Sequence, residues 1–546
     1  MSNTPDKEKI RLRPDMLTKG EFIAAAILVA VLVPVTRMAG SMCAGYLSVP
    51  LILYFFSCGI FLVSFERSVC KMVKFRIKRD QYQNALSLFK KSLLIAFIID
   101  LVLCVILASV AYVLMDKFFY MERGYIILWL VLPAILCVSV QGCIRGYLHG
   151  MGYTIQNFVS MLIMSISSLI ISVVLSFVAN SYGEKVNALL HVDYVSRFYT
   201  ACVCMIGFSI GAFLSLLYIV SIYGTKKREI AIFVKTGATR YLESKNEVLE
   251  YLMNSVPIML IMCLVGLVNI RLYLYTTESG EFNSIYISEL GVLIGMVMPV
   301  VLITVFVMLI PYVKKWYQIE AAMKKGKKEI ASVLYSQLSH SMVRAFAPVT
   351  FFVMFMSDIL QEVIYGKTLG EEPGLLSFSA VLIIITGIFI FLQWFVIRLE
   401  NTRLLMIGLI IFAVVNIIAS LFFMLVLHRG LHAIVLSFII SMLVFDIVFY
   451  KLIGALLGYG VGDFARPVIA LASGLVAAIV AFLCKIALRY VIGEILTLAA
   501  CIVVSYVIYI LILTLLHGVD RHSLMKLPLG KFFIKMMDAN SRRYSE

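Results

Sequence analysis

The feature that most constrains this chain is the recurrence of apolar runs, each about 18 residues or longer, along almost its whole length. A run of that length crosses a hydrocarbon core of about 30 Å as a helix. Membrane barrels instead show alternating segments of about ten residues, which are absent here. Only 14% of the 546 residues are charged, and 62% are hydrophobic. We therefore expect an all-α integral membrane protein.

Polar breaks divide the apolar runs into about fourteen predicted transmembrane helices. They lie near residues 20-37, 43-65, 92-115, 124-143, 154-179, 199-223, 248-273, 286-313, 345-364, 375-397, 404-427, 432-457, 466-488 and 491-516. No cleavage site follows the first span, so we expect it to be retained.

The distribution of Lys and Arg predicts the orientation of these helices. Basic residues crowd into the N-terminal tail, the connections after the second, sixth and eighth spans, and the C-terminal tail, all on one side. The positive-inside rule makes that side cytoplasmic. We expect a multi-pass protein of the plasma (inner) membrane with both termini in the cytoplasm. Anionic lipid near the helix ends accounts for the net charge of +16, so no nucleic-acid partner is expected.

Connections on the opposite side are short, and the longest is expected around NSYGEKVNALLHVDYVSR. No separate outside domain can fold from segments of that size. Membrane glycosyltransferases and polymerases usually carry larger outside loops, so we expect no such enzyme here.

An internal repeat is suggested by the two long basic loops after spans 2 and 8. Each leads into an amphipathic approach to the next span, ALSLFKKSLLIAF in one case and ASVLYSQLSHSMVRAF in the other. Because six is an even number, repeats six spans apart have parallel orientation, as in two-lobed transporters. The alternative is a coincidence of loop charge. We expect two pseudo-symmetric six-helix lobes and a C-terminal helix pair, divided as follows: 1-19 tail, 20-225 N-lobe, 226-247 inter-lobe loop, 248-457 C-lobe, 458-516 appended spans 13-14, and 517-546 basic tail.

Motifs for catalysis or nucleotide binding are missing. Gly366-Lys367-Thr368 comes nearest to a phosphate-binding loop, but Gln361 stands where the motif needs glycine. The seven histidines show no metal-ligand spacing. We therefore expect no enzyme, metal or cofactor, and a transport cycle driven by H⁺, Na⁺ or the membrane potential.

Charged residues inside the spans are the functional candidates, because charge is costly in lipid. The acidic candidates for ion coupling are Glu66, Asp100, Asp358 and Asp446. A structural pair between helices explains each of these acids nearly as well. Arginines near span ends, such as Arg37 and Arg271, also fit simple snorkelling to the head groups.

Four prolines predict helix irregularities. Pro34, Pro257, Pro311 and Pro348 lie in or beside spans 1, 7, 8 and 9. Each removes a backbone donor, so we expect kinks at these points.

Several segments together resemble a known family. They are PVTRMAGSMCAGYLSVPLILYFFSCGIF, RDQYQNALSLFKKSL, CIRGYLHGMGYTIQNFVSML, GFSIGAFLSLLYIVSIYG and HGVDRHSLMKLPLGKFF. In this order they resemble the polysaccharide-flippase branch of the multidrug/oligosaccharidyl-lipid/polysaccharide (MOP) exporter superfamily, in particular proteins like sporulation stage V protein B and lipid II flippases.

The resemblance implies a flippase that moves a polyprenyl-diphosphate-linked oligosaccharide or peptidoglycan precursor by alternating access, for polysaccharide biosynthesis. A diphosphate is a dense anion that arginines would neutralise. The residues expected to bind this head group are Arg37, Arg145, Arg271 and Arg344. The chain departs from the family pattern at Leu32, at Phe65-Glu66 and around Arg271-Leu272. These departures leave room for a different substrate or coupling ion.

Two other functions stay open: a cation-coupled multidrug exporter of the same superfamily, and a non-transporting scaffold for the cell envelope. For the flippase, the expected partners are the lipid-linked sugar, membrane lipids and enzymes of envelope biosynthesis. One chain already supplies two lobes, so we expect a monomer.

Overall fold

The computed structural model describes residues 13–236, 245–253, 256–276, 283–366, 374–398, 402–458 and 465–516, together with Gly518, Met525, Gly530 and Ile534. The predicted N-terminal tail lies mostly outside these residues. So do most of the basic C-terminal tail, part of the inter-lobe loop, and Lys367 and Thr368 of the phosphate-loop-like segment.

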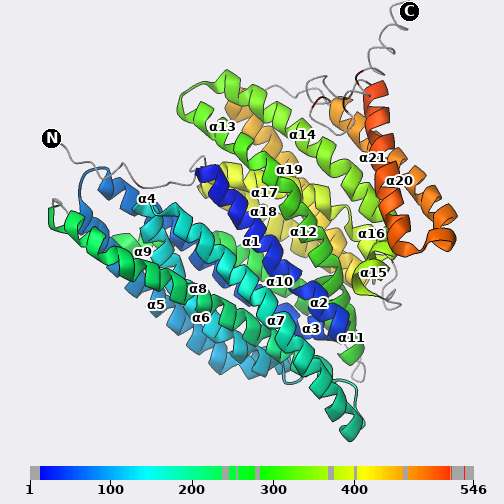
Figure 1. Cartoon of the computed structure of the whole chain (residues 1–546), viewed down its shortest axis with the longest axis horizontal. Coiled ribbons are helices and arrows are strands. Elements are labelled where there is room, and N and C mark those ends of the chain that lie inside the picture. The colour runs from blue at the N-terminus through cyan, green and yellow to red at the C-terminus, as the bar shows by residue number, and fades with distance from the viewer. Residues whose placement is uncertain are drawn as a thin grey trace, which may run out of the picture. The chain divides into compact units, whose positions relative to one another are not determined.

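Within the described residues, fourteen helices are long and apolar enough to cross a membrane, which confirms the predicted number and the all-α class (Figure 1). No strand occurs in the part of the chain that the structure describes. Each helical stretch matches one predicted span, although many extend beyond the apolar run. The reason is that the hydrocarbon core requires only about 20 helical residues, while the helix can continue into the polar region.

The chain divides into two compact units, which are described separately. The first contains Met1–Val307 and Glu400–Ser437. Its helices and π-helical turns are α1 (Pro14–Ala30), α2 (Leu32–Ala39), α3 (Ser41–Cys58), η2 (Gly59–Phe65), α4 (Glu66–Ile77), α5 (Tyr82–Tyr112), η3 (Val113–Phe118), α6 (Gly124–Gly150), α7 (Thr154–Leu190), α8 (Val195–Thr236), α9 (Lys245–Met253), α10 (Val256–Thr276), α11 (Asn283–Val292), η4 (Leu293–Val297), most of α12 (Met298–Leu309), α18 (Thr402–Leu421), η6 (Phe422–Val426) and the start of α19 (Leu431–Leu457).

The second unit contains Met308–Leu399 and Phe438–Glu546. Its elements are the end of α12, the 3₁₀ turn η5 (Ile310–Tyr312), α13 (Val313–Lys324), α14 (Lys328–Phe355), α15 (Ser357–Tyr365), α16 (Leu375–Ser379), α17 (Leu382–Arg398), the rest of α19, α20 (Ala465–Ile492) and α21 (Glu494–Leu515). The division into an N-lobe and a C-lobe remains a prediction.

Helices α7 and α8 form a long antiparallel pair in the first unit (Figure 1). With 42 residues, α8 is about 63 Å long, roughly twice the thickness of a hydrocarbon core. The segment predicted as the longest outside loop is mostly helical, because α7 continues to Leu190 and α8 begins at Val195. The Asn187 side chain accepts a hydrogen bond from the Val195 amide at 3.0 Å and so caps α8. This part of the loop prediction is corrected.

Two of the four prolines coincide with helix interruptions, and a third lies at the start of a helix. Helix α1 ends at Ala30, four residues before Pro34, whose missing N–H leaves that carbonyl without its usual donor. Pro257 follows the start of α10, and Pro311 lies in the turn η5. Pro348 lies inside α14, where the carbonyl of Arg344 accepts a hydrogen bond from the Tyr509 hydroxyl at 2.6 Å instead.

The two predicted repeats share local structure. Asp80 before α5 and Gly326 before α14 both have positive φ, and the next residues, Gln81 and Lys327, have similar φ and ψ values. The predicted spans 2 and 8 each contain a π-helical turn, η2 and η4. π-Helical turns also occur in the predicted spans 3 and 11, as η3 and η6, so the repeat of six spans remains a prediction.

Candidate functional site

A stripe of glycines sets the spacing between α6 and the second membrane-spanning helix. A Cβ atom on Gly142 would lie 2.1 Å from the Phe61 carbonyl oxygen, and one on Gly146 would lie 2.8 Å from the Glu66 carbonyl oxygen. Gly150, one turn further, packs against Val73 in the same way. The backbones can approach this closely because glycine has no side chain. The side chains beside this stripe therefore face η2 and α4 at short range.

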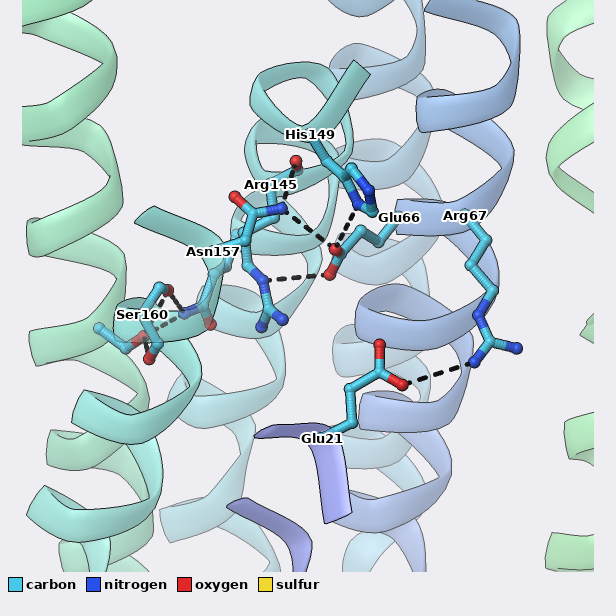
Figure 2. Close-up of polar contacts among 9 residues, drawn as sticks. Glu21, Glu66, Arg67, Arg145, His149, Asn157 and Ser160 are labelled. Atoms are coloured by element: carbon cyan, nitrogen blue, oxygen red, sulfur yellow. Dashed lines mark hydrogen bonds and ion pairs between the residues drawn. The ribbon is translucent and has the colours of Figure 1, made fainter. Parts of the chain in front are cut away.

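Glu66 is the centre of a buried ionic cluster (Figure 2). Its carboxylate oxygen Oε2 lies 3.1 Å from Arg145 Nε, and its Oε1 lies 3.7 Å from His149 Nδ1. The Asn157 amide donates to Glu66 Oε1 at 3.2 Å and to the Arg145 carbonyl at 2.8 Å. Arg145 is 1% exposed and Glu66 4% exposed. We call Glu66, Arg145, His149 and Asn157 the Glu66 cluster.

The terminal nitrogens of Arg145 are not used by this pair. Among the described residues, neither Nη1 nor Nη2 donates a hydrogen bond, and Figure 2 shows both pointing away from Glu66. A guanidinium presents five donors in a planar fork that suits phosphate and carboxylate groups. The cluster therefore contains a buried cation with spare capacity to bind an anion.

A network of uncharged side chains lies beside the cluster. The Gln141 amide donates to Ser160 Oγ at 3.0 Å and also to Ser215, and the Ser160 and Ser215 hydroxyls are 3.0 Å apart. All three residues are fully buried. The network ties α6 to α7 and α8, so the helices that carry Arg145 and Asn157 are held together.

A more exposed ion pair lies near the cluster. Arg67 points away from Arg145 and pairs with Glu21 of α1 at 3.7 Å (Figure 2). Both side chains are more than one third exposed. This pair is therefore expected to contribute little to stability.

Helices α3 and α11 form a close seam at the end of the first unit that the sequence predicts to be outside. The Ser41 and Ser288 hydroxyls are 2.6 Å apart. A Cβ on Gly45 would lie 1.9 Å from the Ile287 carbonyl oxygen, and one on Gly291 would lie 1.7 Å from that of Ser41. Because α3 belongs to the predicted N-lobe and α11 to the predicted C-lobe, the seam joins the two halves at this end.

Arg37 and Arg271 lie near this end and have different surroundings. Arg37 is exposed in the last turn of α2, just before the seam. The guanidinium of Arg271 lies over the rings of Phe118, Tyr120 and Tyr275, with its carbon 4.9–5.7 Å from the ring centroids. Its buried Nη1 has no hydrogen-bond partner among the described residues. Cation–π contacts thus account for the position of Arg271.

Arg344, the fourth predicted head-group residue, lies in the second unit. Its Nε donates to the His340 carbonyl at 3.3 Å and its Nη1 to the Gly518 carbonyl at 3.5 Å. It therefore links α14 to the residues after α21.

The acids Asp100 and Asp446 are both buried in their spans. Asp100 Oδ1 accepts a long hydrogen bond from Cys104 Sγ, at 4.0 Å. The buried Oδ2 atom of Asp100 has no hydrogen-bond partner among the described residues. Neither carboxylate oxygen of Asp446 has such a partner within the described ranges. Asp100 also has the Ser139 hydroxyl as a donor. A buried acid without any donor in the described part of the chain, such as Asp446, is more stable in its neutral form or with a bound cation than as a bare anion.

Asp358 belongs to a second ionic cluster, which joins α15 to α20. Lys485 Nζ lies 2.7 and 2.9 Å from the two carboxylate oxygens of Asp358. Arg489 bridges Asp358 at 3.5 Å and Glu362 at 2.6 Å. We call these four residues the Asp358 cluster. Asp358 is 43% exposed, whereas Lys485 is 6% exposed.

The structure thus brings Glu66 and Arg145 into direct contact and gives Asp358 two basic partners that the sequence analysis did not consider. His149 and Asn157 were also missed. The sequence did contain indications for some of these missed residues. His149 lies four residues after Arg145 in one helix, and Lys485 and Arg489 are basic residues in or beside an apolar run, where partners of opposite charge are expected.

Comparison with known proteins shows the fold. No protein-family model and no curated protein sequence matches the chain. Among solved structures, a lipid II flippase MurJ in an inward closed conformation matches with a TM-score of 0.63 at 12% identity, covering 92% of this chain and 98% of that one. An inward-facing multidrug resistance MATE family transporter of the MOP superfamily matches with a TM-score of 0.60 at 12% identity, covering 82% of this chain and 98% of that one. A MOP superfamily transporter from Pyrococcus furiosus matches with a TM-score of 0.52 at 13% identity, covering 84% and 99%. This chain is a multi-pass membrane protein with the fold of the MOP-superfamily transporters.

Proposed function

We propose that the protein is a flippase that carries a lipid-linked saccharide with a diphosphate head group across the membrane by alternating access. The observation that carries this choice is the extent of the structural match. The match to the flippase covers 92% of this chain with a TM-score of 0.63, and the match to the MATE transporter covers 82% with a TM-score of 0.60.

The last helix pair is firmly built into the second unit. Helix α20 packs against α14, where a Cβ on Gly474 would lie 3.2 Å from the backbone of Ala347 and Pro348. The Asp358 cluster adds an ionic contact between α20 and α15. A permanent helix pair outside a twelve-helix body suits a protein whose substrate has a long lipid tail, since it enlarges the surface available to the tail.

Arg145 is the head-group residue with the clearest capacity for an anion. In the present state it is enclosed and held by Glu66 through Nε. In the proposed cycle, the phosphate binds the Nη groups of Arg145 when the site opens. Arg37, which is exposed, meets the same head group near the opposite end of its path.

A drug exporter is the second candidate, and Asp446 is compatible with it. Its buried carboxylate has no hydrogen-bond donor among the described residues. A proton or a sodium ion would satisfy it, as coupling requires. The same residue can also couple a flippase to H⁺ or Na⁺, so Asp446 alone does not separate the two functions.

Reconstituted vesicles test the proposal. We expect the purified chain to move a fluorescent polyprenyl-diphosphate sugar between leaflets, and Arg37→Ala and Arg145→Gln each to slow this at least tenfold. Asp446→Asn tests ion coupling in the same vesicles. Efflux of a cationic dye without movement of the lipid would support the exporter. Movement of neither, by a folded protein, would support the scaffold.

A further inference from the structure

The Glu66 cluster has one member with a partly exposed side chain, and it lies at the end of a candidate span. The His149 side chain is 21% exposed, compared with 5% for Glu66 and 2% for Arg145. His149 lies in the last turn of α6, one helical turn beyond Arg145. A helix C-terminus favours a positively charged imidazole. His149 is therefore placed to exchange a proton with the aqueous side while it contacts the buried carboxylate.

The groups around His149 come from three helices. Helix α4 presents the Glu66 carboxylate, the Cys70 thiol and the Lys74 ammonium. Helix α6 presents Arg145, and α7 presents the uncharged amide of Asn157, which also donates to Glu66. Arg67, next to Glu66, pairs with Glu21 instead. Histidine is the side chain in this set whose ordinary titration falls between about pH 5 and 8.

The charge on His149 determines how the Glu66 carboxylate divides its interactions between Arg145 and His149. With a neutral imidazole, Glu66 and Arg145 form a pair of zero net charge. With a protonated imidazole, Glu66 has two cations, and the three groups together carry one positive charge. Glu66 then divides its interaction between Arg145 and His149, so its attraction to Arg145 is weaker. An anion that binds the free Nη groups of Arg145 meets a net positive charge. Anion binding must in turn favour protonation, because such coupling is reciprocal.

We propose that His149 is a positioning residue that couples proton uptake to the binding of an anionic head group at Arg145. This inference rests on the proposed function, since it needs a phosphate ligand for Arg145. The direction of the pH dependence of anion affinity follows from the charges. Affinity rises as the pH falls through the titration of His149, by at most about tenfold per pH unit for one linked proton.

The test uses the full chain in detergent and a polyprenyl-diphosphate sugar as the probe. Each phosphorus of the probe carries one ester and one anhydride bond and so has no second, weakly acidic proton, and the probe itself does not titrate between about pH 6 and 10, the range over which binding is measured. Calorimetry in two buffers of different ionisation enthalpy gives the number of protons taken up per bound lipid. For the wild type we expect up to about one proton and an affinity that declines as the pH rises.

Two substitutions and a control separate charge from structure. His149→Gln keeps a hydrogen-bonding group but does not titrate, so it should bind with no proton uptake from this site and a flat pH profile. His149→Lys keeps a positive charge, so it should bind well even at the upper end of the range. His191→Asn, at the exposed end of α7 where φ is positive, should behave like the wild type. If the Gln variant fails to fold, the profile of the Lys variant decides.

Equal proton uptake by the wild type and His149→Gln would overturn the role of His149 and leave the flippase proposal standing. A wild type that does not bind the diphosphate lipid at any pH would overturn both.

Discussion

The two ionic clusters hold charge in the membrane-spanning helices in different ways. In the Glu66 cluster, a carboxylate and a guanidinium are almost completely enclosed, at 5% and 2% exposure of their side chains. In the Asp358 cluster, Lys485 is enclosed, but Asp358 is 43% exposed and Arg489 32% exposed. In the Asp358 cluster two acids, Asp358 and Glu362, share two basic residues, Lys485 and Arg489. In the Glu66 cluster the carboxylate has one partner that is always positively charged, Arg145.

This difference predicts different sensitivities. A charge that loses its partner in an enclosed site cannot be solvated, while one at a partly open site can be. The Asp358 cluster can also redistribute its contacts, because Arg489 touches both acids. We infer that the Asp358 cluster serves mainly as a helix connector, and that the Glu66 cluster is the site where a change of charge has the larger consequence.

The largest effect is expected from removing Arg145. Arg145→Met leaves Glu66 enclosed with only His149 and Asn157, and should lower the free energy of unfolding by about 3–5 kcal/mol. Thermal unfolding in mild detergent measures this. The double variant Glu66→Leu with Arg145→Met removes both charges and should recover much of the loss. A single variant as stable as the wild type would show that the pair is not enclosed as described.

The next effect concerns the glycine stripe that places α6. Gly142→Ala puts a methyl group against the Phe61 carbonyl, which should cost about 1–3 kcal/mol through forced separation of the helices. Gly224→Ala is the matched control, since a Cβ there meets no atom within 4 Å. It should be neutral or slightly stabilising. Equal stability of the two alanine variants would contradict the close packing of α6.

A smaller effect is expected in the Asp358 cluster. Lys485→Ala removes two hydrogen bonds, but Asp358 keeps Arg489 and contact with water. After allowance for this exposure, we expect a loss of about 1–2 kcal/mol, measured by the same unfolding experiment. A loss as large as that for Arg145→Met would remove the distinction between the clusters.

The smallest effect is expected for the Arg67–Glu21 pair. Arg67→Gln should change stability by less than about 0.5 kcal/mol, because the pair is exposed and 3.7 Å long. It also controls for the loss of a positive charge next to Glu66. A change in the pH profile of lipid binding in this variant would show that Arg67, too, influences the cluster.

The fold was largely predictable because lipid imposes a simple rule on the sequence. Any apolar run of about 20 residues must form a helix, so the fourteen spans follow from hydropathy alone. Helix ends were less predictable. The break at Met356, between α14 and α15, has no proline or glycine at that point, and the freed Met354 carbonyl accepts a hydrogen bond from Ser377.

The site was predictable only in its charged members. Intramembrane charge directed attention to Glu66 and Asp358, because such residues need partners, whereas Arg145 was indicated by the family resemblance. The partners themselves depend on tertiary packing. Glu66 meets Arg145 from another helix because the α6 glycines bring the backbones together, and Asp358 meets Lys485 across 127 residues. Asn157 carried no charge and gave no such signal.

The α3–α11 seam has a consequence for how easily the two helices can separate. At Gly45 and Gly291 the two helices meet backbone to backbone, and the Ser41 and Ser288 hydroxyls share a hydrogen bond across the seam. Surfaces of this kind can part without first withdrawing interlocked side chains from one another. The barrier to separation then arises mainly from the attraction between the two surfaces, and little from side chains that must change rotamer.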